Sequence, residues 1–224
     1  GLTDSEQVEL AFRHAREHSR AVIVEAFIEG LDHRMLVVNG ELIAVSQRRP
    51  GNVVGDGERT IEELVDIVNS DPRRGIGHEK VLTKLTFDAQ AERLMELLGY
   101  TKDSVPPAGE MVFLRSTGNL STGGTAIDMT DVIHPDNREM AIRAAKAIGL
   151  DVAGVDFLTK DIARSYKETN GAICEINAGP GMRMHIAPSE GKGRDVGGAV
   201  MDMLFPSGTP SRIPIAALTG TNGK

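Results

Sequence analysis

Two apolar runs in the second half of the chain carry oxygen-bearing side chains at the spacing of β-strands. Asp156 lies in the run 151–158, and Glu175 and Asn177 lie two residues apart in the run 172–177. Side chains two apart on a strand point to the same face, so Glu175 and Asn177 share one face. A segment rich in turn formers, 159–171, joins the runs, and an antiparallel hairpin would bring all three side chains together.

Carboxylate and amide oxygens are hard ligands, which suit Mg²⁺ better than zinc. Mg²⁺ usually completes its coordination shell with phosphate oxygens of a substrate, which indicates ATP. The alternative is that Asp156, Glu175 and Asn177 are solvated polar positions on a half-exposed hairpin. Spacing alone does not decide between these two interpretations.

Composition narrows the class of protein. The chain has 224 residues, of which 40% are hydrophobic and 25% charged, as in soluble globular proteins. The net charge of −7 argues against a nucleic-acid partner, and no apolar run approaches membrane-spanning length. The single cysteine, Cys174, cannot form an internal disulfide and is expected to pack inside its strand. We therefore predict a cytoplasmic protein with no nucleic-acid or membrane partner.

Hydrophobic periodicity predicts a mixture of helices and strands. Asn39-Gly40 is a two-residue turn signal between two short strands, and Thr60 and Glu63 have the spacing of a capping box. Helices are expected over residues 4–18, 60–69, 88–98, 135–149 and 196–204, and further strands over 21–28, 34–38, 41–47, 112–115 and 126–128. The pattern favours an α+β fold with a mixed or antiparallel sheet flanked by helices.

Arginines border several turns and glycine-rich loops. A guanidinium group matches a phosphate or carboxylate bidentately, although any one of these side chains could equally be a solvated surface charge. The loop 116–124 that follows one of them is polar, glycine-rich and expected to lack core residues, so its backbone N–H groups could surround a ligand. The arginines are Arg34, Arg48, Arg49, Arg115 and Arg183.

Several of these segments together resemble the ATP-grasp ligases. The matching motifs are Val24–Gly30, Asp32–Arg34, Val37–Gly40, Gly154–Phe157 and Glu175–Gly181. The last five residues, Gly220–Lys224, resemble the start of a P-loop, although Leu218 stands where a strict P-loop has its first glycine. An ATP-grasp module followed by a Mur-ligase-like module is similar to the arrangement in the cyanophycin synthetase family.

The resemblance implies roles for individual residues. Glu25, Ala26 and Ile28 match the hinge segment that contacts adenine, and Asp32 matches the acidic residue that binds ribose. Asp156, Glu175 and Asn177 match the Mg²⁺ ligands. The arginines are expected at phosphate or substrate carboxylate groups: Arg34 and Arg48 as cofactor-binding residues, Arg115 and Arg183 as catalytic residues. His78 borders a glycine-containing loop and could touch substrate.

The resemblance also implies a reaction and its partners. ATP phosphorylates a carboxylate, and an amine then displaces the phosphate to form an amide. In the cyanophycin synthetase family the ATP-grasp module adds aspartate to the poly-aspartate backbone of an aspartate-arginine polymer primer, and the downstream module adds arginine. A homo-oligomer is expected for the full-length enzyme. Alternatives are a D-Ala-D-Ala-type or glutathione-type ligase, or a non-catalytic ATP-binding module.

The family pattern divides the chain into three parts. Residues 1–28 would end the central lobe, 29–205 would form the carboxyl-terminal lobe of a partial ATP-grasp fold, and 206–224 would be a linker and the start of the Mur-like domain. The lysines and glycine-rich loop expected from the preceding lobe do not occur in this sequence. The segment alone is therefore expected to bind ATP weakly and not to catalyse.

Overall fold

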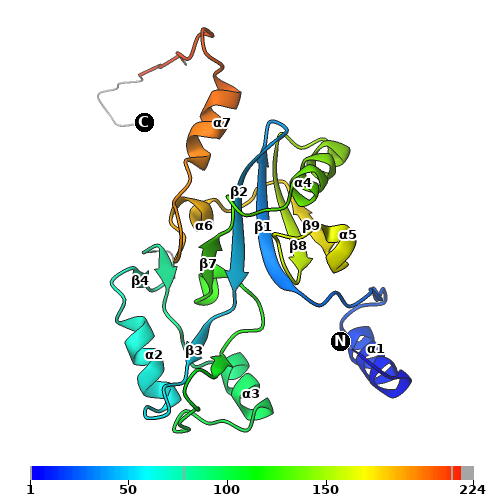
Figure 1. Cartoon of the computed structure of the whole chain (residues 1–224), viewed down its shortest axis with the longest axis vertical. Coiled ribbons are helices and arrows are strands. Elements are labelled where there is room, and N and C mark those ends of the chain that lie inside the picture. The colour runs from blue at the N-terminus through cyan, green and yellow to red at the C-terminus, as the bar shows by residue number, and fades with distance from the viewer. Residues whose placement is uncertain (1, 78, 213, 218–224) are drawn as a thin grey trace, which may run out of the picture.

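A computed structural model describes residues 2–77, 79–212 and 214–217 (Figure 1). The P-loop-like residues 220–224 and His78 lie outside the described residues. No helix in the described part of the chain is long and apolar enough to cross a membrane.

A five-stranded antiparallel sheet organises the larger part of the molecule. Its order is β7-β2-β1-β8-β9. The predicted turn at Asn39-Gly40 joins β1 to β2, and both residues have positive φ, as a tight hairpin turn requires. The strands are β1 Leu31–Val38, β2 Glu41–Arg49, β7 Thr125–Asp128, β8 Val152–Thr159 and β9 Ala172–Asn177.

One face of this sheet packs against α4 (Pro135–Ile148), which begins at the cap residue His134 and ends at Gly149 (Figure 1). Alternate residues of the central strands point to this face, and Met35, Val155 and Phe157 are fully buried there. On the other face, Leu36 of β1 packs against α7 (Val196–Leu204). Beyond the part covered by α7, the same face carries polar residues, among them Arg34, Asp156 and Glu175. The sheet therefore offers a charged surface on an otherwise apolar scaffold.

A small subdomain, residues 52–114, is inserted between β2 and β7, and Figure 1 shows it beside the lower end of the sheet. It has its own buried core, which includes Ile61, Met95 and Leu114. The predicted capping box at the start of its first helix is confirmed, because Thr60 and Glu63 bond to each other's backbone N–H groups. Its elements are β3 Asn52–Val54, α2 Ile61–Asn69, β4 Arg74–Gly75, β5 Leu82–Thr83, α3 Ala89–Leu97 and β6 Met111–Phe113.

Four short or peripheral elements complete the fold. The amino-terminal helix α1 (Ser5–His18) was predicted, and Figure 1 shows it standing apart from the sheet. The others are η1 Leu120–Thr122, α5 Tyr166–Thr169 and α6 Arg183–Ile186.

The expected strand over residues 21–28 is wrong. This segment has the β-branched composition of a strand, but it forms no strand, and Ile23 is 81% exposed. A strand needs a neighbouring strand to bond with, and the described residues offer it none.

Two smaller expectations are also wrong. Cys174 is exposed, because a bulge between Asp156 and Phe157 leaves it without an opposite residue on β8. The loop 116–124 does contain a core residue, since Leu120 is buried.

Candidate functional site

The predicted hairpin of β8 and β9 is confirmed, and it brings the three candidate metal ligands to one face of the sheet. Asp156 lies directly opposite Glu175, and Gly154 lies directly opposite Asn177. Asp156 is buried, whereas Glu175 is exposed. The amide nitrogen of Asn177 points towards the Gly154 carbonyl at 3.5 Å, which leaves the amide oxygen available. Among the described residues no group of three His, Cys, Asp or Glu side chains is placed to hold a metal ion, so the candidate ligands are two carboxylates and the amide of Asn177.

Two arginines surround Asp156: Arg34, which is buried, and Arg48, which is half-buried. Arg34 lies opposite Asp156 on β1 and donates to it through Nε and through Nη2, the latter at 3.1 Å. Arg48 of β2 reaches the same carboxylate at 3.0 Å and donates to Asp32 at 2.7 Å. Burial alone would lower the pKa of Arg48. The hydrogen bonds and charges of Asp32 and Asp156 have a larger effect in the opposite direction, so the pKa of Arg48 lies above its ordinary value. The network holds both guanidinium groups in fixed orientations beside Glu175.

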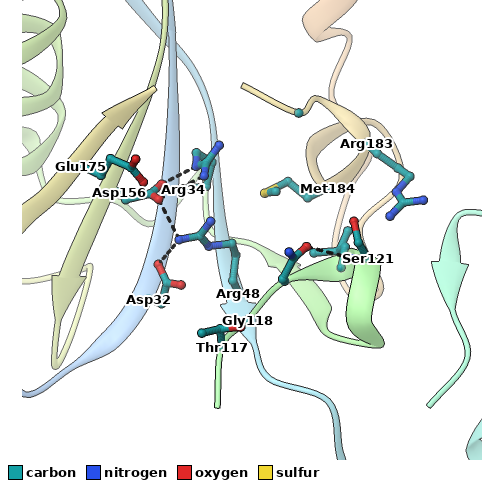
Figure 2. Close-up of a pocket in the computed structure, with 13 residues that line it drawn as sticks. Asp32, Arg34, Arg48, Thr117, Gly118, Ser121, Asp156, Glu175, Arg183 and Met184 are labelled. Atoms are coloured by element: carbon teal, nitrogen blue, oxygen red, sulfur yellow. Dashed lines mark hydrogen bonds and ion pairs between the residues drawn. The ribbon is translucent and has the colours of Figure 1, made fainter. Parts of the chain in front are cut away.

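These side chains form one wall of a cavity of about 780 Å³, within the usual size range of small-molecule sites. Figure 2 shows Asp32, Asp156 and Glu175 on one side and Arg183 with Ser121 on the other. Arg183 and Met184 come from α6, and Ser121 comes from η1. We call this the arginine-lined cavity, and its wall comprises Asp32, Arg34, Arg48, Thr117–Ser121, Asp156, Glu175, Gly181, Arg183 and Met184.

The loop 116–124 closes on β2 because it carries glycine at the point of contact. A Cβ atom at Gly118 would stand 2.7 Å from Cβ of Arg48, closer than real side chains approach. Asn119 caps η1 by accepting from the N–H of Ser121 at 3.0 Å, and Gly123 ends it with φ of +98°. The predicted ligand-facing loop therefore forms the cavity wall next to Arg48.

A buried histidine that sequence reasoning missed anchors α6 to the sheet. His185 Nδ1 and the hydroxyl of Ser46 on β2 form a hydrogen bond of 2.9 Å. Burial, helped by Arg34 and Arg48, lowers the pKa of His185 to about 4, so the ring is neutral near pH 7. The two residues lie 139 positions apart, and no local pattern announces their contact.

Several predicted site residues lie outside the arginine-lined cavity. Glu25 and Ala26 are exposed and border a separate hollow beside α1, and Ile28 lines another hollow with Lys160. Arg115 directly follows the small subdomain and is buried against it, where its guanidinium group contacts Thr86 and Asp88 rather than the cavity. Asp88 caps α3, so Arg115 fixes the start of that helix.

Comparison with known proteins agrees with this geometry. Residues 114–199 match the RimK-like ATP-grasp domain. The crystal structure of a bifunctional glutathione synthetase from Pasteurella multocida superposes with a TM-score of 0.72 at 36% identity, covering 92% of this chain and 28% of that one. The chain has the ATP-grasp fold of these ligases.

The ATP-grasp chain also has close relatives in sequence. It is 55% identical over 219 residues to cyanophycin synthetase of Trichormus variabilis and 59% identical over 206 residues to that of Synechocystis, covering 98% and 92% of the chain and 24% of each relative. It is 39% identical to the glutathione biosynthesis bifunctional protein GshAB of Clostridium perfringens, covering 88% of the chain and 25% of the relative. The chain thus spans about a quarter of the length of these relatives. The resemblance to ATP-grasp ligases and cyanophycin synthetases is confirmed.

Proposed function

We propose that this chain forms the Mg²⁺- and phosphate-binding part of an ATP-dependent ligase that makes amide bonds. The observation that carries the proposal is the direct pairing of Asp156 with Glu175 beside Arg34 and Arg48, both of which are paired with Asp156. Carboxylates can bind a metal cation, and guanidinium groups beside them can bind the anion that the metal carries. An ATP molecule with its magnesium ion is such a ligand.

The donor set fits magnesium. Asp156, Glu175 and Asn177 offer oxygen atoms from one face of the hairpin, and thiol and imidazole groups are absent from this set. When bound there, Mg²⁺ would neutralise charge on the phosphate groups. Arg34 and Arg48 would bind phosphate oxygens from one wall of the arginine-lined cavity. Arg183 would bind phosphate oxygens or a substrate carboxylate from the opposite wall. No side chain is needed as a covalent nucleophile in this scheme.

The finer part of the proposal concerns the substrate. We propose that the full-length protein adds aspartate to the poly-aspartate backbone of an aspartate-arginine polymer, with arginine added by a downstream module. The identity to cyanophycin synthetases, 53–59%, exceeds the 37–39% identity to the GshAB proteins, which favours this substrate over a glutathione-type one. The division at residues 28 and 205, a homo-oligomeric state and a cytoplasmic location belong to the same proposal.

The test uses the full-length protein and the pair Glu175→Gln and Glu139→Gln. Glu139 is an exposed residue of α4, which covers the opposite face of the sheet. Phosphate release is measured with ATP, Mg²⁺ and polymer primer, with and without aspartate, and with arginine omitted to silence the downstream module. We expect Glu175→Gln to lower aspartate-dependent release on the order of 100-fold and Glu139→Gln to leave it unchanged.

Two outcomes would contradict the proposal. Unchanged release in Glu175→Gln at all Mg²⁺ concentrations would refute the metal site. Release that requires γ-glutamylcysteine and glycine, with no response to aspartate and primer, would refute the substrate and support a glutathione-type ligase.

A further inference from the structure

A second cavity lies where the end of β2 meets the small subdomain. Its volume is about 310 Å³, and it shares no lining residue with the arginine-lined cavity. Parts of the sheet, of α2 and of β4 contribute to it. We call it the Arg74 cavity, and its wall comprises Arg49, Asn52, Val53, Val54, Leu64, Ile67, Val68, Arg74, Gly123, Thr125 and Glu190.

Arg74 is a buried cation with no ion pair among the described residues. Asp71 attracts it electrostatically, but the Asp71 carboxylate is itself paired with Arg73. Arg74 is only 6% exposed, and its Nη1 donates to the backbone carbonyls of Thr83 and, at 3.2 Å, of Gly123. Among the described residues no carboxylate lies within ion-pair distance of it. The other two buried arginines in the described ranges each have one: Arg34 pairs with Asp156, and Arg115 pairs with Asp88. A buried charge is costly without a counter-charge, so a ligand that supplies one would bind favourably.

The remaining donors of Arg74 are not fully sealed from solvent. Its Nε and Nη2 atoms have no hydrogen-bond partner among the described residues. Two side-chain atoms of the described residues are sealed from solvent and lack a hydrogen-bond partner, Arg48 Nε and His185 Nε2. No atom of Arg74 is in this group, so its unbonded donors are not sealed. Arg74 is largely enclosed and lines this cavity, so the cavity is where a ligand can meet its guanidinium group.

The rest of the wall defines the charge and shape of a ligand. Arg49 faces Glu190 at 3.6 Å, a loose pair that largely cancels, so the unmatched charge of the cavity is the single positive charge of Arg74. Leu64, Ile67 and Val68 of α2 supply an apolar side. The guanidinium edge accepts a planar carboxylate bidentately, and the apolar side accommodates a short aliphatic chain.

We propose that the Arg74 cavity binds a carboxylate carried on a short aliphatic chain, with Arg74 as the principal donor. Such a group can come from a free aliphatic acid or from an acidic side chain of a peptide. This site is distinct from the proposed nucleotide site, because the two cavities have no lining residue in common.

The probe is 4,4,4-trifluorobutyrate, observed by ¹⁹F NMR relaxation in the presence of the full-length protein at constant ionic strength. The neutral amide, 4,4,4-trifluorobutyramide, is the matched control ligand. We expect the ¹⁹F resonance of the acid to broaden when the protein is added and the resonance of the amide to remain sharp. Displacement by propionate alone identifies a site for free acids, and displacement by N-acetylaspartate amide as well identifies a site that admits peptide side chains.

Variants assign the signal to a cavity. Arg74→Gln is expected to weaken binding of the acid about tenfold or more, whereas Arg73→Gln, a change of the neighbouring exposed arginine, leaves it unchanged. If Arg74→Gln does not fold, Ile67→Trp on the exposed side of α2 fills the cavity and should also abolish the broadening. No broadening with the wild-type protein, or broadening lost in Arg183→Gln but retained in Arg74→Gln or Ile67→Trp, would overturn the proposal.

Discussion

Replacing Gly154 by alanine tests how closely the metal-binding hairpin and the arginine network are packed together. Gly154 lies on β8 two residues before Asp156 and opposite Asn177. A Cβ atom there would stand 2.5 Å from Cβ of Pro180 and 3.1 Å from Cδ and Nη1 of Arg34. The first distance is far below carbon–carbon contact, so one of the neighbours must move.

The free-energy cost of this substitution depends on whether Arg34 or Pro180 moves to make room for the new Cβ atom. The end of Arg34 is a flexible side chain, but Pro180 is a rigid ring in the turn that follows β9. Overpacking of this kind costs about 1–3 kcal/mol. Since 1.4 kcal/mol is tenfold in an equilibrium constant, the local opening of β8 and β9 should become roughly 5- to 150-fold more frequent.

Hydrogen exchange of the full-length protein, followed by mass spectrometry on peptides covering residues 152–159 and 172–177, measures this opening. Gly179→Ala is the matched control in the same turn, because a Cβ atom there meets nothing within 4 Å and Gly179 does not have positive φ. Its exchange should stay within about twofold of wild type. Equal protection in the two variants would refute the packing argument. On the proposed function, aspartate-dependent phosphate release should also fall in Gly154→Ala, since Arg34 is displaced from its place beside Asp156.

Two further predictions concern groups outside the cavity. Between pH about 6.5 and about 4 the unfolded chain protonates His185 while the folded chain does not, so stability falls as pH decreases through this window, by about 3 kcal/mol in all. Urea unfolding midpoints at pH 7.5 and 5 should therefore differ more for wild type than for His185→Gln, and equal differences would contradict the burial argument. Asn137 of α4 donates to the carbonyls of Ile162 and Arg164 and accepts from the N–H of Tyr166, so Asn137→Ala should destabilise by about 3 kcal/mol. Glu139→Ala on the same helix should be neutral, and an equal loss in both variants would show that these hydrogen bonds contribute little.

The features predicted correctly from the sequence are those specified by neighbouring residues. The β1–β2 hairpin follows from Asn39-Gly40, whose conformation few other pairs adopt. The common face of Glu175 and Asn177 follows from the two-residue period of a strand, and the antiparallel hairpin expected across the turn-rich segment 159–171 brings them to the strand of Asp156. Segment 21–28 has the same local signal for a strand but failed, because pairing depends on a partner that local composition does not provide.

The site residues that the sequence could not place depend on contacts between distant segments. Arg34 and Arg115 both border turns, yet one points into the arginine-lined cavity and the other into the small subdomain. The face on which a side chain emerges depends on strand register, which is set by partners 122 residues away for Arg34. Ser46 and His185 likewise become neighbours only when α6 docks on β2.

The arginine network also explains why Glu175 is a cleaner probe of metal binding than Asp156. A carboxylate has about four lone-pair sites. Asp156 already accepts two hydrogen bonds from Arg34 and pairs with Arg48, so about one site is left for a metal ion. Replacing Asp156 would leave the buried guanidinium group of Arg34 and the half-buried one of Arg48 short of counter-charge and disturb the sheet itself. Glu175 is exposed, so its replacement changes the metal-facing charge while Asp32 and Asp156 continue to hold the arginines in place.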